Sequence, residues 1–189
     1  ASANQFRIPT YQRGYDWKGD AQVKDLFGDL TESIESKFSN NLFLGTMIFD
    51  VGSRDVKDQV EIIDGQQRFT TILIALIAAR NFARHILQDV DLAHAIQPSI
   101  QSSDPFSDTK CEKLFASETV ADVMKVMSQF EWDGAFPDSV EQAGTKVKKP
   151  IKRQVARVEP IYKFAFSQIG EYCEGNSKTK FKQLMSQIY

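Results

Sequence analysis

The chain of 189 residues is poor in the residue types that build metal sites and disulfide frameworks. It has two cysteines, Cys111 and Cys173, and two histidines, His85 and His94, all in unrelated segments. This spacing assembles neither a zinc site nor a set of disulfides, so packing or surface roles are expected for all four. Because the first residues do not read as a signal peptide either, we expect a cytoplasmic protein.

An excess of one charge and a long hydrophobic run are also missing. Lys and Arg number 23 against 25 Asp and Glu, a net charge of −2, so any contact with a nucleic acid has to be local. The longest apolar run covers residues 69–79, whereas crossing a bilayer takes about 20 apolar residues. We therefore expect no membrane contact and a buried core element at this run. The apolar content of 42% is that of an ordinary globular protein.

The first half of the chain alternates between strand and helix patterns. Residues 6–8 are expected to be extended, and a loop and a helix that begins at Asp20 follow. Residues 42–51 and 56–63 are rich in β-forming residues and predict two strands of a hairpin. The second strand leads directly into a long apolar helix that reaches residue 87.

The second half predicts helices joined by polar loops. Ser117 is the expected cap of a helix near residues 120–127, residues 131–150 are expected to be a loop, and a helix over 152–174 contains Pro160. A last apolar stripe ends at Tyr189. These patterns predict an α+β fold, in which a small mixed sheet with packed helices (residues 1–95) is followed by an all-helical extension (residues 96–189) packed on that core. Because the last stripe has no local partner, we expect a fragment of a longer protein.

The segment Asp-Gly-Gln-Gln-Arg at residues 64–68 lies where a strand gives way to the long helix. A helix N-terminus offers unpaired N–H groups and the positive end of a dipole, which favour a phosphate. Gly65 permits close approach to the backbone, Arg68 offers a bidentate donor, and Asp64 suits Mg²⁺. The alternative is structural: Asp64 caps the helix, and Arg68 pairs with an acid such as Glu61.

A second cluster covers residues 8–17, with the sequence IPTYQRGYDW. Its rings are suited to stacking on a base, and Gln12 and Arg13 offer donors to phosphate or base edges. The alternative is ordinary packing of Tyr15 and Trp17 over the first helix.

A basic stretch with no acidic residue lies between residues 144 and 157. Its cations are candidate contacts to DNA phosphates, and the alternative is a solvated surface loop. The candidate residues are Lys146, Lys148, Lys149, Lys152 and Arg153.

Taken together, IPTYQRGYDW, LFLGTMIF and IIDGQQRFTTI resemble the N-terminal domain of the GmrSD-type restriction enzymes, also called domain of unknown function family 262. The resemblance is close over residues 5–90. It implies a fold similar to ParB and sulfiredoxin, and binding and hydrolysis of GTP or ATP with Mg²⁺. It also implies a place in bacterial defence against modified phage DNA, with an HNH-type nuclease domain in the same or a partner chain.

The resemblance places the family's two motifs on Asp64 to Arg68 and on Tyr11 to Arg13. From the chemistry of these residues we expect catalytic roles for Asp64, Arg68 and Arg13, and a Mg²⁺ role for Asp64. The expected nucleotide contacts are Tyr11, Gln12, Arg13, Gly65, Gln66, Gln67 and Arg68, together with the hydroxyl of Thr71. The chain has no HNH-like histidine cluster, and it has Gln66 and Gln67 where sulfiredoxin needs a cysteine. We therefore expect a regulatory nucleoside triphosphatase domain that is neither a nuclease nor a thiol reductase. The alternative is a non-catalytic module that binds DNA or a protein.

Overall fold

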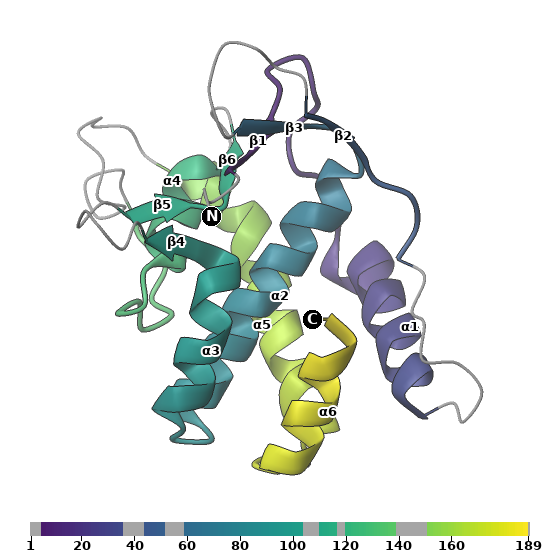
Figure 1. The fold of residues 1–189 in the computed structure, drawn as a ribbon, viewed down its shortest axis with the longest axis vertical. Helices are drawn as coiled ribbons and strands as arrows, with labels where there is room; N and C mark the ends of the chain where they lie inside the picture. Colours follow the sequence, from purple (N-terminus) through teal and green to yellow (C-terminus); the bar gives the residue numbers. More distant parts are fainter. Residues whose placement is uncertain are drawn as a thin grey trace.

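The computed structural model describes residues 5–35, 44–51, 59–103, 110–116, 120–138 and 151–188. A small sheet lies at one end of a group of helices (Figure 1). Several predictions fall outside the described residues: the cap at Ser117, the hairpin turn at residues 52–55, and the DNA contacts of Lys146, Lys148 and Lys149.

The sheet has four strands among the described residues, in the order β2-β3-β1-β6. Their bounds are β1 Gln5–Ile8, β2 Ile48–Asp50, β3 Gln59–Asp64 and β6 Leu114–Ala116. β1 pairs in parallel with both β3 and β6, whereas β2 and β3 are antiparallel. The hairpin predicted for residues 42–63 is therefore confirmed, with a shorter first strand. Residues 44–47 form a loop instead, because Gly45 adopts a φ of +83° that a strand does not accommodate.

The long helix α2, Gln66–His85, is the centre of the molecule, with helices packed on several sides of it (Figure 1). Nearly every residue from Leu73 to Ala83 is buried, which is typical of a helix surrounded by other elements. The prediction of a long core helix is confirmed. The surrounding elements are a short π-helical turn η1 (Gly19–Val23) and the α-helices α1 (Lys24–Glu35), α3 (Val90–Ile100), α4 (Ala121–Ser128), α5 (Lys152–Tyr172) and α6 (Lys178–Ile188).

The α+β class is confirmed, but the region after residue 95 is not made of helices alone. It contains β6 and the antiparallel pair β4 (Gln101–Ser103) and β5 (Lys110–Glu112). The reason for this correction is physical: three-residue strands are stabilised by partners distant in sequence and carry almost no local pattern. β6 pairs with β1, so the second half of the chain completes the sheet of the first half.

None of the helices among the described residues is both long and apolar enough to span a membrane.

Candidate functional site

The strand β3 ends at Asp64, and α2 begins two residues later, with Gly65 between them. Gly65 has a φ of +86°, a left-handed conformation that favours glycine. A Cβ on Gly65 would lie 2.8 Å from Cγ and 3.3 Å from Cα of Met47, so the 44–47 loop fills this side of the turn. The Asp64 carboxylate is exposed and accepts a hydrogen bond of 2.8 Å from the amide of Gly65.

The two glutamines of the motif point at the loop between β1 and η1. The side-chain amide of Gln66 donates to the carbonyl of Arg13 at 2.9 Å and to Oε1 of Gln12 at 3.2 Å. Gln67 donates to the carbonyl of Gly14 at 3.0 Å and accepts from the amide of Asp16 at 2.8 Å. Both glutamine side chains are buried, each 7% exposed. They fix residues 12–16 over the start of α2.

Two further hydrogen bonds connect the same loop to the strand and the helix. Gln12 donates to the carbonyl of Ile63 at 2.8 Å. The hydroxyls of Tyr15 and Thr71 lie 2.8 Å apart, and that of Thr71 also donates to the carbonyl of Gln67. Burial raises the pKa of Tyr15 to about 12, and the hydrogen bond with Thr71 offsets part of that rise. The interpretation of Tyr15 as a packing residue is confirmed, since it is 4% exposed.

Arg68 holds the 44–46 loop. Its guanidinium donates to the carbonyl of Leu44 at 2.9 Å and to that of Thr46 at 2.8 Å. A Cβ on Gly45 would lie 1.7 Å from Nη1 of Arg68, so only glycine leaves room for this guanidinium. The structural alternative of an Arg68–Glu61 pair is wrong, because Glu61 forms its ion pair with Arg7 at 3.6 Å.

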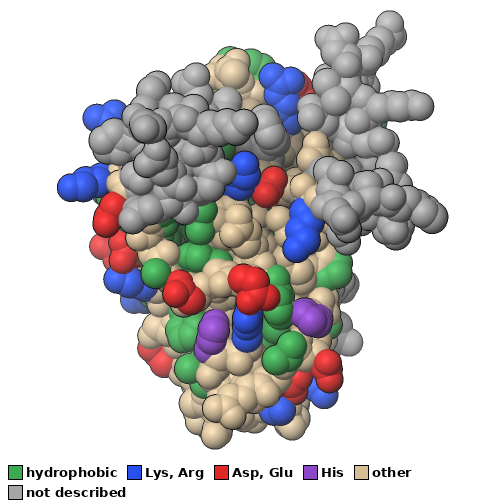
Figure 2. All heavy atoms as spheres, turned by 90° about the vertical axis from the view of Figure 1, so that its left-hand side faces the viewer, with side chains coloured by type: hydrophobic (Ala, Val, Ile, Leu, Met, Phe, Trp, Pro, Cys, Tyr) green, Lys and Arg blue, Asp and Glu red, His purple; other side chains and the backbone are tan. Residues whose placement is uncertain are grey.

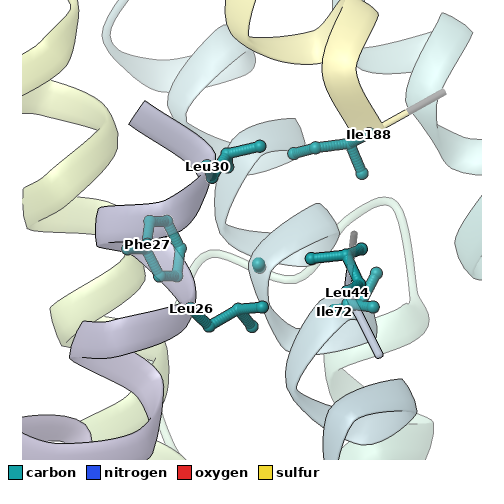
Figure 3. Close-up of a pocket in the computed structure, with 7 residues that line it drawn as sticks. Leu26, Phe27, Leu30, Leu44, Ile72 and Ile188 are labelled. Atoms are coloured by element: carbon teal, nitrogen blue, oxygen red, sulfur yellow. The ribbon is translucent and has the colours of Figure 1, made fainter. Parts of the chain in front are cut away.

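Leu44, whose carbonyl accepts one of these bonds, also contributes its side chain to the helical core. Leu44 lines a small apolar cavity of about 30 Å³ between α1, α2 and the end of α6, together with residues such as Leu26 and Ile72 (Figure 3). The DGQQR motif is therefore connected to the helical core through Leu44.

Three of the sequence-predicted residues leave their side chains accessible to a ligand. Tyr11 is 71% exposed, and Arg13 and Asp64 are also exposed. Asp64 directly precedes the turn at Gly65, and Tyr11 and Arg13 lie on the loop that Gln66 and Gln67 bind at the start of α2. The arrangement suits an anion: exposed cationic and aromatic side chains at the positive end of a buried, 20-residue helix.

A Mg²⁺ ion at this position would rely on few protein ligands. The described residues contain no group of three or more His, Cys, Asp or Glu able to hold a metal ion. One oxygen of the exposed Asp64 carboxylate is engaged by Gly65, and the carboxylate keeps its second oxygen. This donor set fits Mg²⁺, which usually retains several waters and binds one or two carboxylates plus substrate phosphates.

The described part of the basic stretch begins at residue 151 and lies on α5. Lys152 and Arg153 are exposed in the first turn of α5, which has no acidic residue. They do not take part in the site at the start of α2 described above.

Arg80 is a polar residue that the sequence reasoning treated only as the end of an apolar run. It is fully buried and donates to side-chain and backbone oxygens, with distances of 2.8 Å to Oε1 of Gln97, 2.8 Å to the carbonyl of Met127 and 2.9 Å to that of Ser128. Desolvation lowers the pKa of Arg80 to about 10, so it stays charged at neutral pH. The burial of Arg80 could have been predicted only from the apolar residues on both sides of it in the sequence. They imply a helix that is buried on all sides and that includes Arg80.

The comparison with known families agrees with the motifs. A family model described as GmrSD restriction endonuclease, N-terminal domain, matches residues 1–187. The chain belongs to this family. GmrSD membership places the domain in a restriction and phage-defence protein and implies a nuclease domain as its partner. No curated protein matches the chain.

Proposed function

We propose that this GmrSD N-terminal domain binds a nucleoside triphosphate, GTP or ATP, at the start of α2 and hydrolyses it to regulate its nuclease partner. The observation that supports the proposal most directly is the 2.9 Å hydrogen bond from Gln66 to the carbonyl of Arg13. It fixes the backbone of an exposed arginine near the positive end of a buried helix, and phosphate oxygens favour this combination of charges.

In this proposal Arg13 binds the phosphates and stabilises the charge that develops during transfer, and the positive end of the α2 dipole adds a favourable potential. Tyr11 stacks on the base, and Asp64 orients the hydrated Mg²⁺, which neutralises phosphate charge when bound. Four further residues position the loop of residues 12–16 and do not contact the nucleotide themselves: Gln12, Gln66, Gln67 and Thr71. Arg68 acts through residues 44–46.

Arg13 gives the cleanest test because its side chain is exposed. Arg13→Ala is expected to weaken binding of labelled GTP and ATP at least about tenfold, since it removes a charge-assisted hydrogen bond. Asp64→Asn is expected to lower Mg²⁺-dependent phosphate release. The matched control is Arg7→Ala, which removes a half-exposed arginine of β1 and leaves binding unchanged. Wild-type nucleotide affinity in Arg13→Ala would reject the proposal.

One observation favours DNA binding as a second function. Lys152 and Arg153 lie at the positive end of the α5 dipole, where cations are disfavoured unless an anion compensates them. The test measures duplex binding over a series of salt concentrations. The slope of the logarithm of the binding constant against the logarithm of the salt concentration is expected to become shallower by about one unit for each phosphate contact removed. The test compares Lys152→Glu and Lys148→Glu with the exposed Lys163→Glu on the same helix. Equal slopes in all three variants would exclude the DNA role.

A further inference from the structure

A polar cleft of about 610 Å³ lies on the face formed by α3, β4, β5 and the end of α4, the face that Figure 2 turns toward the viewer. Basic, acidic and histidine side chains lie close together there. None of the residues that line the cleft belongs to the site at the start of α2. Its volume is within the range of small-molecule sites, about 300–1,000 Å³.

A chain of polar contacts forms the floor of the cleft. The buried Arg80 donates to Gln97, whose amide donates to Oε1 of Gln101 at 3.3 Å. Gln101 in turn lies 3.5 Å from Oε1 of Glu112. Because Gln97 and Gln101 are oriented by these partners, the carboxylate of Glu112 is presented to the cleft in a defined position. A positioned carboxylate accepts hydrogen bonds from hydroxyl groups.

The charges around the cleft favour an anion. The buried Arg80 guanidinium donates to neutral oxygens of Gln97, Met127 and Ser128, and it adds positive charge behind the lining residue Gln97. Glu131 at the rim is already paired with Arg84 at 2.9 Å. Among the described residues that line the cleft, Lys110 and Lys125 therefore face one unpaired carboxylate, that of Glu112, and these residues give a positive field.

We propose that this cleft is a second binding site, which takes a phosphorylated sugar. Lys110 and Lys125 bind the phosphate, and the carboxylate of Glu112 accepts hydrogen bonds from the sugar hydroxyls. The same chemistry is offered by a free sugar phosphate and by a nucleotide unit of a nucleic-acid strand.

Calorimetric titration with ribose 5-phosphate tests the site. Lys125→Gln is expected to weaken binding at least about tenfold, because it removes one charge-assisted contact to phosphate. Glu112→Gln is expected to weaken binding of ribose 5-phosphate and to leave the weaker binding of inorganic phosphate unchanged. The control is Lys163→Gln, which removes an exposed lysine of α5 outside the cleft. Thermal melting of each variant checks that it is folded.

Equal affinity of Lys125→Gln and Lys163→Gln for ribose 5-phosphate would overturn the proposal, as would inorganic phosphate binding as tightly as ribose 5-phosphate. Loss of ribose 5-phosphate binding in Arg13→Ala would also overturn it, because the ligand would then occupy the triphosphate site. Wild-type affinity in Arg13→Ala supports a separate cleft site, whatever the result for triphosphate. A five-nucleotide oligothymidylate that binds tighter than ribose 5-phosphate, and weakens in Lys125→Gln, identifies a strand as the source.

Discussion

Arg68 donates its two hydrogen bonds to groups of the chain itself, the carbonyls of Leu44 and Thr46. Arg68→Ala is therefore expected to lower the free energy of unfolding by about 1–2 kcal/mol in the absence of nucleotide, since it leaves these carbonyls without their donor. Urea denaturation followed by circular dichroism measures the change.

Arg7→Ala serves as the comparison for Arg68→Ala. It breaks a half-exposed ion pair with Glu61 and is expected to cost less than about 0.5 kcal/mol. If Arg68→Ala unfolds at the same urea concentration as Arg7→Ala, then Arg68 does not stabilise the 44–46 loop.

Tyr15 predicts a dependence of stability on alkaline pH. Its pKa is raised to about 12 in the folded chain from an ordinary value of 10.0, so the folded state retains the phenol proton longer. The stabilisation is fully present below pH 10 and is lost as the pH rises toward 12. At pH 11 the loss is about 1 kcal/mol, from one unit of pKa difference.

Denaturation of the wild type and of Tyr15→Phe at pH 8 and pH 11 checks this dependence. Tyr15→Phe is expected to be less stable at pH 8, because the hydrogen bond between Tyr15 and Thr71 is lost, and to lose less stability than the wild type between the two pH values. A change in stability of equal size in both proteins would assign the effect to other groups, such as Tyr162, whose pKa burial also raises.

The polar residues of the motifs show where prediction from the sequence reached its limit. The motifs correctly located the junction between β3 and α2, with the turn at Gly65 and the helix that follows it. They did not separate residues that face solvent, such as Arg13, from residues that hold the loop, such as Gln67. The partners of Gln67 are backbone groups of Gly14 and Asp16, more than fifty residues away. Every residue type offers such groups, so no side-chain pattern marks them.

At the scale of elements, the surrounding helices bury their apolar side chains against α2. Ile77 on α2 is fully buried, whereas Ile86 just after the helix is 45% exposed. Ile77→Ala is expected to cost about 2–5 kcal/mol because it leaves a cavity in the core. Ile86→Ala is expected to cost less than about 1 kcal/mol. Thermal and urea unfolding of the two variants measure the difference, and equal costs would contradict the central position of α2.

Long periodic elements could be predicted, and short ones could not. Residues 72–79 are all apolar, so the presence of α2 was clear from the sequence. β6 has three residues and is stabilised by pairing with Phe6, Arg7 and Ile8, which lie more than a hundred residues earlier. No local propensity reports such a pairing.

At the scale of the whole molecule, the division into residues 1–95 and 96–189 leads to a direct experiment. A fragment of residues 1–95 lacks β6 and α5, and it exposes Phe82, whose ring packs on those of Phe166 and Phe181 in the full chain. We expect this fragment to show no cooperative unfolding, because the buried face of α2 loses its cover. Circular dichroism during urea titration measures it against the full chain. A cooperative transition in the fragment would show that residues 1–95 form an independent domain.

The position of β1 between β3 and β6 has a consequence for synthesis on the ribosome. β1 leaves the exit tunnel before both of its neighbours, and one of them, Leu114–Ala116, is translated more than a hundred residues later. At about 5–20 residues per second, β1 waits several seconds with one edge uncovered. During that interval the nascent sheet presents a free edge to chaperones and to neighbouring nascent chains.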